Sequence, residues 1–200
     1  MSAVNGGDVR SVLMVGVGGQ GTILAGRILS EGLAEAGYDV KMSEIHGMSQ
    51  RGGSVSTHVR FGERVRSPVT GRGGADVIAA FEKLEALRWL EYLKEGGLML
   101  INDFEIPPAP VLMGLEPYPD GIADELSGRA RVGVFDARAI AEGLGNARAM
   151  NMVLLGALAK AVGVGGVDWE GTIRRNVKKG FEDLNIRAFE HGFLRLGPFG

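Results

Sequence analysis

Hydrophobic residues near the start of the chain change their spacing in a way that predicts a strand, a helix and a second strand. Residues 12–17 (VLMVGV) form a short apolar run bounded by polar residues and glycine, which is typical of a fully buried parallel strand. Apolar residues then recur at helical spacing from Ala25 to Ala36, and Gly37 follows where helices commonly end in a left-handed residue. Residues 38–42 predict the second strand, so the chain opens in the β-α-β order of an α/β fold.

The next segment has the two-residue alternation of a strand. We predict that it turns at Gly62 and Glu63 into Arg64–Ser67, which would form an antiparallel hairpin. One face of the strand would carry Val55, Thr57, Val59 and Phe61, and the other Ser56, His58 and Arg60.

The middle of the chain predicts a strand at 76–81, a helix at 82–94 and a strand at 98–101. The segment from Phe104 to Pro119 holds five of the seven prolines, so no helix can run through it. We expect an extended excursion with a short edge strand at 111–113.

The last part of the chain predicts a strand at 131–135 and then helices only. Asp168 is a plausible N-cap for a helix through Lys179, and a final helix is expected from Phe181. We therefore predict a single α/β domain over residues 1–200: a Rossmann-like, mainly parallel sheet with an antiparallel hairpin and a helical C-terminal third. The first of these helices would turn one apolar face inward, made of Met150, Val153, Leu154, Ala157, Leu158 and Ala161.

Composition narrows the function classes. The net charge of −2 gives no electrostatic argument for nucleic acid, and the 33 glycines show no period, so they indicate tight connections. The chain has no cysteine, so it cannot supply thiolate nucleophiles or the ligands of an iron–sulfur cluster. Its three histidines are far apart, so we expect no metal site and assign no catalytic residue. No apolar segment is long enough to span a bilayer, and we expect a cytoplasmic protein with no membrane partner.

The sequence GVGGQG at Gly16–Gly21 lies between the first strand and the first helix. Glycines there let backbone N–H groups point at a phosphate at the positive end of the helix. The pattern is G-x-G-x-x-G, and Glu44 follows where an acid that binds a ribose is expected. A nicotinamide or flavin site is thus one interpretation, and a glycine-dependent turn without a ligand is the other.

A second glycine-rich loop, HGMSQRGG at residues 46–53, weakens the dinucleotide interpretation. In a Rossmann dehydrogenase a helix follows the ribose-binding acid, whereas here Glu44 continues into this loop. Arg51 offers five donors in fixed geometry beside two glycines that allow close backbone approach. We expect His46 to shape the loop or contact a ligand, with no partner that would make it a general acid or base, and His58 to be structural.

A basic stretch near the C-terminus has two interpretations. A solvated helix face is the more common one, and a contact with a partner or a phosphate is the alternative. Its members are Arg174, Arg175, Lys178 and Lys179.

These motifs occur together in an order that resembles the gamma-type domain of the 2-oxoacid:ferredoxin oxidoreductases. They are GVGGQG, SEIHGMSQRGGSVSTHVRFG at 43–62, ADVIAAFEKLEALR at 75–88 and NMVLLGAL at 151–158. In the related pyruvate and 2-oxoglutarate enzymes the second loop more often reads YGPEMRGG. The loop sequence HGMSQRGG is most similar to that of the small (beta) subunit of indolepyruvate ferredoxin oxidoreductases.

The resemblance implies the oxidative decarboxylation of a 2-oxoacid with coenzyme A, with electrons passed to ferredoxin. Thiamine diphosphate and the iron–sulfur clusters would lie on a large partner subunit. This chain would cover the active site and help to hold coenzyme A. The resemblance places the contact surface at Gly18, Gly19, Gln20, Gly21, His46, Ser49, Gln50, Arg51, Gly52 and Gly53.

Two other function classes remain open from the sequence. The Rossmann-like fingerprint permits a free-standing NAD(P)- or flavin-dependent oxidoreductase, which would retain nucleotide when purified. The lack of an acid–base constellation permits a non-catalytic regulatory or assembly module, which would not raise the turnover of its partner.

Overall fold

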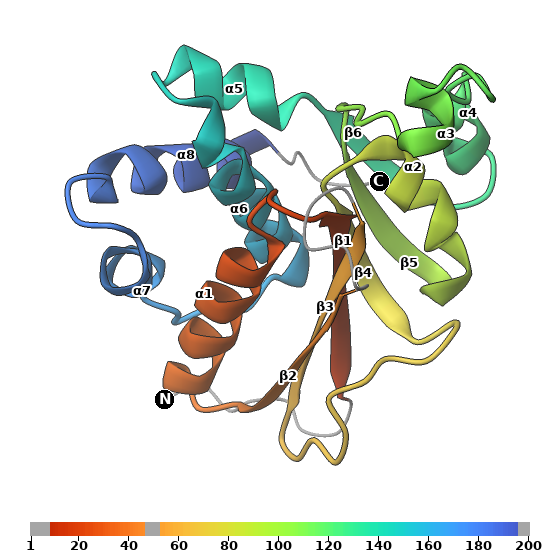
Figure 1. The fold of residues 1–200 in the computed structure, drawn as a ribbon. Helices are drawn as coiled ribbons and strands as arrows, with labels where there is room; N and C mark the ends of the chain where they lie inside the picture. Colours follow the sequence, from red (N-terminus) through yellow and green to blue (C-terminus); the bar gives the residue numbers. More distant parts are fainter. Residues whose placement is uncertain (1–8, 47–52, 196–200) are drawn as a thin grey trace.

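A six-stranded mixed sheet forms the centre of the computed structural model, which describes residues 9–46 and 53–195 (Figure 1). β1, β4, β5 and β6 are parallel neighbours, so the sheet is mainly parallel, as predicted. In spatial order the strands are β2 (Asp39–His46), β3 (Ser54–Gly62), β1 (Arg10–Val17), β4 (Ala75–Ala80), β5 (Leu93–Asn102) and β6 (Arg131–Phe135).

β3 is antiparallel to both of its neighbours, β1 and β2. The antiparallel hairpin is therefore present, but its arms are β2 and β3, and the predicted pairing of 55–61 with Arg64–Ser67 is wrong. Residues 64–67 instead pack beside β3 in irregular conformation. The Val65 N–H donates to Asp39 Oδ2 at 2.7 Å, and Arg60 Nη1 donates to the Ser67 carbonyl at 3.0 Å, so other partners satisfy this segment.

Helices cover both faces of the sheet, and each face has its own hydrophobic cluster. Alternation along β1 sends Met14 to one cluster and Leu13 to the other. α2 (Lys83–Arg88) and α4 (Ile122–Ser127) cover the Leu13 face, on the right in Figure 1. The Met14 face is covered by α1 (Thr22–Glu35), α5 (Ala137–Gly143), α6 (Met150–Val162), α7 (Trp169–Asn176) and α8 (Glu182–Arg195).

α6 is the most deeply buried helix of this second layer. The single apolar face predicted for it is too narrow, because Met152, Leu155 and Ala159 on its other sides are also buried. Glycines let α8 approach it closely. A Cβ at Gly156 would lie 1.9 Å from the Phe189 carbonyl oxygen, and a Cβ at Gly192 would lie 1.8 Å from that of Val153.

Several predicted element ends shift in the structure. The helix expected at 82–94 ends at Arg88, a 3-10 turn follows at Leu90–Tyr92, and β5 begins at Leu93. Asp168 caps α7 as predicted, with its carboxylate accepting from the Gly171 N–H at 2.9 Å. α7 stops at Asn176 and does not reach Lys179, because Val177 is in an extended conformation.

The proline-rich excursion carries a helical turn where an edge strand was expected. α3 (Ala109–Leu112) occupies the predicted strand position, and Pro110 lies in its first turn, where a missing N–H costs no intrahelical hydrogen bond. Within the described ranges, no helix is both long and apolar enough to cross a membrane.

Glycine at the crossing of α6 and α8 gives a test of the fold. Gly156→Ala should lower the free energy of unfolding by about 1–3 kcal/mol, because its methyl group would overlap the α8 backbone. Gly143→Ala is the matched control, since a Cβ there meets no atom within 4 Å. Urea unfolding followed by circular dichroism measures both. Equal midpoints for the two variants would contradict the close crossing.

Candidate functional site

The glycine turn, residues 16–21, connects β1 to α1 and leaves the N-terminus of α1 open. Gly19 and Gly21 have backbone φ values of 100° and 83°, which residues other than glycine rarely adopt. Gly21 is the N-cap residue, so no side chain caps the helix, and the first turn contains no acidic residue. The first intrahelical bond is that of the Ala25 N–H to the Gly21 carbonyl, which leaves the earlier N–H groups available to an anion.

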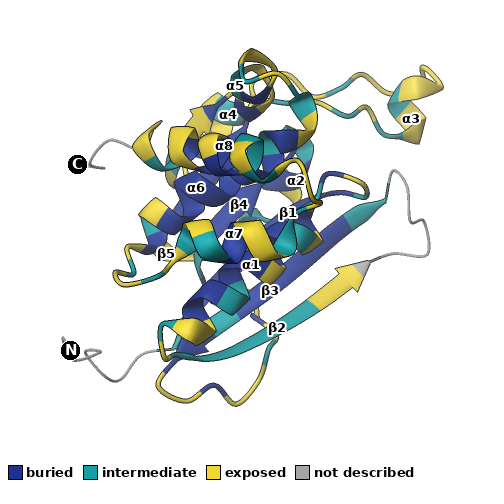
Figure 2. Ribbon diagram, turned by 90° about the vertical axis from the view of Figure 1, so that its left-hand side faces the viewer, coloured by how far each residue is buried: buried dark blue, intermediate teal, exposed yellow. Residues whose placement is uncertain are grey.

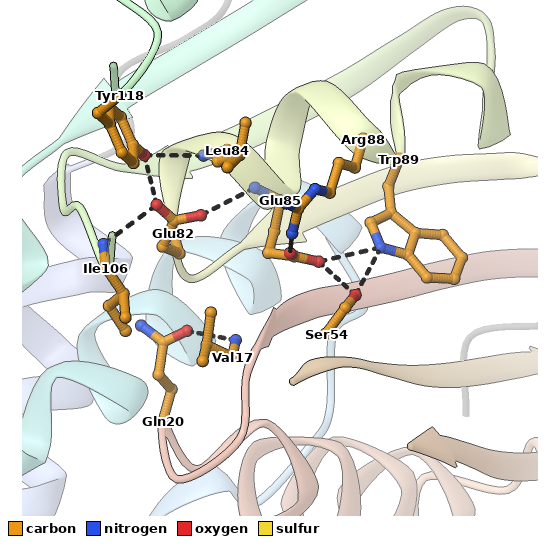
Figure 3. Close-up of polar contacts among 10 residues, drawn as sticks. All are labelled: Val17, Gln20, Ser54, Glu82, Leu84, Glu85, Arg88, Trp89, Ile106 and Tyr118. Carbon is orange, nitrogen blue, oxygen red and sulfur yellow. Dashed lines mark hydrogen bonds and ion pairs between the residues drawn. The ribbon is translucent and has the colours of Figure 1, made fainter. Parts of the chain in front are cut away.

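The Gln20 side chain points into the protein (Figure 3). Its Oε1 accepts from the Val17 N–H at 2.7 Å, and its Nε2 donates to the Phe81 carbonyl at 2.8 Å. Gln20 thus ties the end of β1 to the end of β4. Both ends of the amide are therefore committed to backbone groups, and the Gln20 N–H donates to the Val17 carbonyl at 3.2 Å. The expectation that Gln20 contacts a ligand stays a prediction.

The second glycine-rich loop returns directly beside the glycine turn. The Gly18 N–H donates to the Gly53 carbonyl at 3.0 Å, and Ser54 is paired with Val17 at the end of β1. β2 ends at His46 at the same edge of the sheet, because β1 and β2 run in the same direction on either side of β3. The expected contact residues Ser49, Gln50, Arg51 and Gly52, and the His46 side chain, lie outside the described part.

A cavity of about 490 Å³ lies against the glycine turn. Ile23 is 38% exposed there and supplies apolar surface, while Arg27, one turn further along α1, brings a guanidinium to its wall. Backbone donors, apolar surface and a cation together suit a ligand that has both anionic and apolar parts. The lining residues are Gly18, Gly19, Gly21, Thr22, Ile23, Leu24, Arg27 and Val55.

A second hollow, of about 320 Å³, shares Gly19 and Gly21 with the first and has two arginines in its wall. The Arg138 guanidinium lies 5.1 Å from the centre of the Phe104 ring and also bonds Glu142, and Arg148 is exposed. Sequence reasoning missed both arginines, because each looks like an ordinary surface charge more than a hundred residues from the turn.

Two buried carboxylates on α2 organise the surroundings of these loops (Figure 3). Glu85 is fully buried, and its carboxylate accepts from Ser54 Oγ at 2.5 Å, from Trp89 Nε1 at 3.2 Å and from Arg88 Nη1 at 2.5 Å. It therefore holds the residue at which the second loop enters β3.

Glu82 is the N-cap of α2 and accepts from the Glu85 N–H at 2.9 Å. The same carboxylate accepts from the Ile106 N–H at 3.2 Å and from the Tyr118 hydroxyl. Burial and the Glu82 carboxylate raise the pKa of Tyr118 far above that of a free phenol, so its proton stays in this bond.

His58 has the structural setting that its strand pattern predicted. It is 1% exposed, and its Nδ1 accepts from the Thr70 N–H at 3.2 Å, so the ring is neutral with its proton on Nε2. Burial lowers the pKa of His58, which keeps it uncharged.

The arginines of the C-terminal basic stretch are engaged within the protein. Arg174 bonds Glu170 and Asp183, and Arg175 bonds Glu31 and Glu35 on α1. The pairs with Asp183, Glu31 and Glu35 join α7 to α8 and α1, and the two lysines of the stretch are exposed.

The geometry does not match a Rossmann dinucleotide site. Because β3 lies between β1 and β2, Glu44 is two strands away from the glycine turn, about 10 Å in the plane of the sheet. Its side chain is exposed, and the next described element after β2 is β3.

The chain matches the family described as pyruvate ferredoxin/flavodoxin oxidoreductase over residues 11–194. It is 43% identical to the indolepyruvate oxidoreductase subunit IorB of Thermococcus kodakarensis over 91% of this chain and 93% of that protein. The 2-oxoglutarate synthase subunit KorC of Methanothermobacter thermautotrophicus is 30% identical over 92% of this chain and 93% of its own length.

Solved structures show the same architecture. The gamma subunit of a keto/oxoacid ferredoxin oxidoreductase from Geobacter sulfurreducens superposes with a TM-score of 0.68 at 25% identity, covering 92% of this chain and 96% of that one. A fold match with a TM-score of 0.72 at 18% identity covers 94% of this chain but 31% of a longer chain, the 2-oxoglutarate:ferredoxin oxidoreductase of Magnetococcus marinus. The chain belongs to the pyruvate ferredoxin/flavodoxin oxidoreductase family, as a small subunit of the kind found in indolepyruvate oxidoreductases.

Proposed function

We propose that this chain is the small subunit of a thiamine-diphosphate and iron–sulfur 2-oxoacid:ferredoxin oxidoreductase that acts on indolepyruvate or another aryl 2-oxoacid. The reaction is oxidative decarboxylation to an acyl-coenzyme A. Sequence identity carries this proposal. Indolepyruvate oxidoreductase subunits are 38–43% identical over more than nine-tenths of this chain, whereas the 2-oxoglutarate synthase subunits reach 30%.

The redox and thiamine chemistry belongs to a larger partner subunit in this proposal. The chain has no cysteine to bind a cluster, and in the described ranges no three His, Asp or Glu side chains gather as a metal site. The residues present therefore do not fit an iron–sulfur cluster. Ferredoxin would take its electrons from the partner's clusters.

The role left to this chain is to cover the active site and help to hold coenzyme A. Coenzyme A has phosphates, amides and an apolar pantetheine arm. The open N-terminus of α1 can bind phosphate, and Ile23 can contact the apolar part. The proposed contact surface comprises Gly18, Gly19, Gln20, Gly21, His46, Ser49, Gln50, Arg51, Gly52 and Gly53. Gly19 and Gly21 border the cavity, whereas the bond from the Gly18 N–H to the Gly53 carbonyl fixes the two loops beside each other.

Arg51 tests the placement of this surface. Arg51→Ala should fold normally and still purify with the large subunit. The assembled enzyme should lose about 1.5–3 kcal/mol of coenzyme A or transition-state binding, as expected for a charged hydrogen bond. Steady-state kinetics with varied coenzyme A measure the loss. Arg64→Ala, an exposed arginine at the far end of β3, is the control. Unchanged kcat and KM for coenzyme A in Arg51→Ala would leave the loop as a structural turn only.

The isolated chain should be colourless, metal-free and inactive toward 2-oxoacids, because its sequence has no cysteine and no recognisable thiamine diphosphate motif. Absorption spectra, metal analysis and a ferredoxin-reduction assay measure these properties, with the assembled enzyme as the positive control. A flavin or nicotinamide nucleotide bound to the purified chain would instead support a free-standing oxidoreductase. If the large subunit turned over equally fast without this chain, a regulatory or assembly module would be supported.

A further inference from the structure

An apolar tip stands out from the body of the protein at α3. We name residues 104–119 the arm; it connects the end of β5 to the region before α4. Figure 2 shows α3 projecting from the rest of the fold, largely exposed. Leu112, Met113 and Leu115 are 74%, 73% and 73% exposed, which is unusual for three large apolar side chains so close together.

The base of the arm is fixed on both sides. The Glu82 carboxylate accepts from the Ile106 N–H on the outgoing side and from the Tyr118 hydroxyl on the returning side. Lys83 adds ion pairs to Asp103 at 3.0 Å and to Glu105 at 2.6 Å. A buried carboxylate thus closes the arm at its root, so the apolar tip is presented in a defined position.

The tip is also closed internally. The Leu115 N–H donates to the Pro110 carbonyl at 2.9 Å, and the Met113 N–H donates to the Ala109 carbonyl at 3.0 Å. Proline at 107, 108 and 110 restricts the backbone further. Little conformational entropy remains to be lost when the tip is covered, which favours binding.

The stretch of chain that carries the tip is acidic. Residues 103–128 contain no lysine or arginine. Two copies of the arm in contact would therefore bring like charges together, whereas a surface with an apolar hollow and a basic rim would complement it. Of the six acidic residues in this stretch, Asp103 and Glu105 pair with Lys83, and Glu125 pairs with Arg129. The charge offered to a partner therefore comes from the exposed residues Glu116, Asp120 and Asp124.

We propose that the arm docks into an apolar hollow with a lysine- or arginine-rich rim on the large partner subunit. This rests on the proposed function, which supplies that subunit. The arm leaves the carboxyl end of β5, the same edge of the sheet as the glycine turn, and Phe104 at its root lines the hollow beside Gly19 and Gly21. A subunit held by the arm lies over the glycine turn, where the proposed ligand surface is.

Binding affinity tests the apolar tip. The triple variant Leu112→Ser, Met113→Ser, Leu115→Ser should bind the purified large subunit at least about 50-fold more weakly, because clustered apolar anchors dominate interfaces. Val69→Ser is the control. Val69 is 48% exposed in the loop after β3, at the opposite end of the sheet, and should change affinity less than about twofold. Circular dichroism should show both variants folded.

Association kinetics test the negative charge of the arm. Glu116→Lys with Asp120→Lys should slow association about 3- to 10-fold at low salt, and the difference should vanish at high salt. A benzophenone amino acid in place of Met113 should crosslink to the large subunit on illumination, which tests the placement even if the triple variant folds poorly.

The outcomes separate the two proposals. If the unaltered chain forms no complex with the large subunit, the proposed function fails and this inference fails with it. If the complex forms and the triple variant binds as tightly, or the benzophenone yields no adduct, only the docking role of the arm is overturned. The chain alone could also self-associate, and the triple variant could lose this self-association. That result would assign the arm to a contact with a second copy and would overturn its docking on the large subunit.

Discussion

The insertion of β3 between β1 and β2 determines the rest of the site. Because β3 is antiparallel to both neighbours, the loop that joins β2 to β3 must lie at the edge where β1 gives way to the glycine turn. The hydrogen bond from Gly18 to Gly53 is a direct result of this topology. The same insertion places Glu44 two strands away from the glycine turn. The sequence GVGGQG therefore matches the dinucleotide-binding pattern, but its surroundings differ from those of a Rossmann dinucleotide site.

Strong periodic signals predicted the main elements well. The buried runs of β1 and β4 and the long helices α1 and α6 follow from hydrophobic spacing, because their burial is set by neighbours on one or both faces. The sequence alone did not predict α4 and α5. They are six and seven residues long, and α5 packs through Ala137 and Ala141, whose small side chains give a weak apolar signal.

The side chains of the site were less predictable than its position. Gln20 has the polarity of a ligand contact, and only the structure shows that both ends of its amide are taken by Val17 and Phe81. Arg138 and Arg148 reach the glycine turn through tertiary packing that no local pattern encodes. The partner strand of β3 was also missed, because alternation identifies a strand but not the strand with which it pairs.

One helix of six residues, α2, connects the arm to the second glycine-rich loop. Glu82, at the start of α2, anchors both sides of the arm, and Glu85, in its first turn, binds Ser54 where the second glycine-rich loop ends. The arm is therefore joined to α2 through the Glu82 carboxylate, and the start of β3 is joined to the same helix through Glu85. In the assignment proposed above, α2 is the shared support of the surface that docks the large subunit and of the surface that binds the ligand.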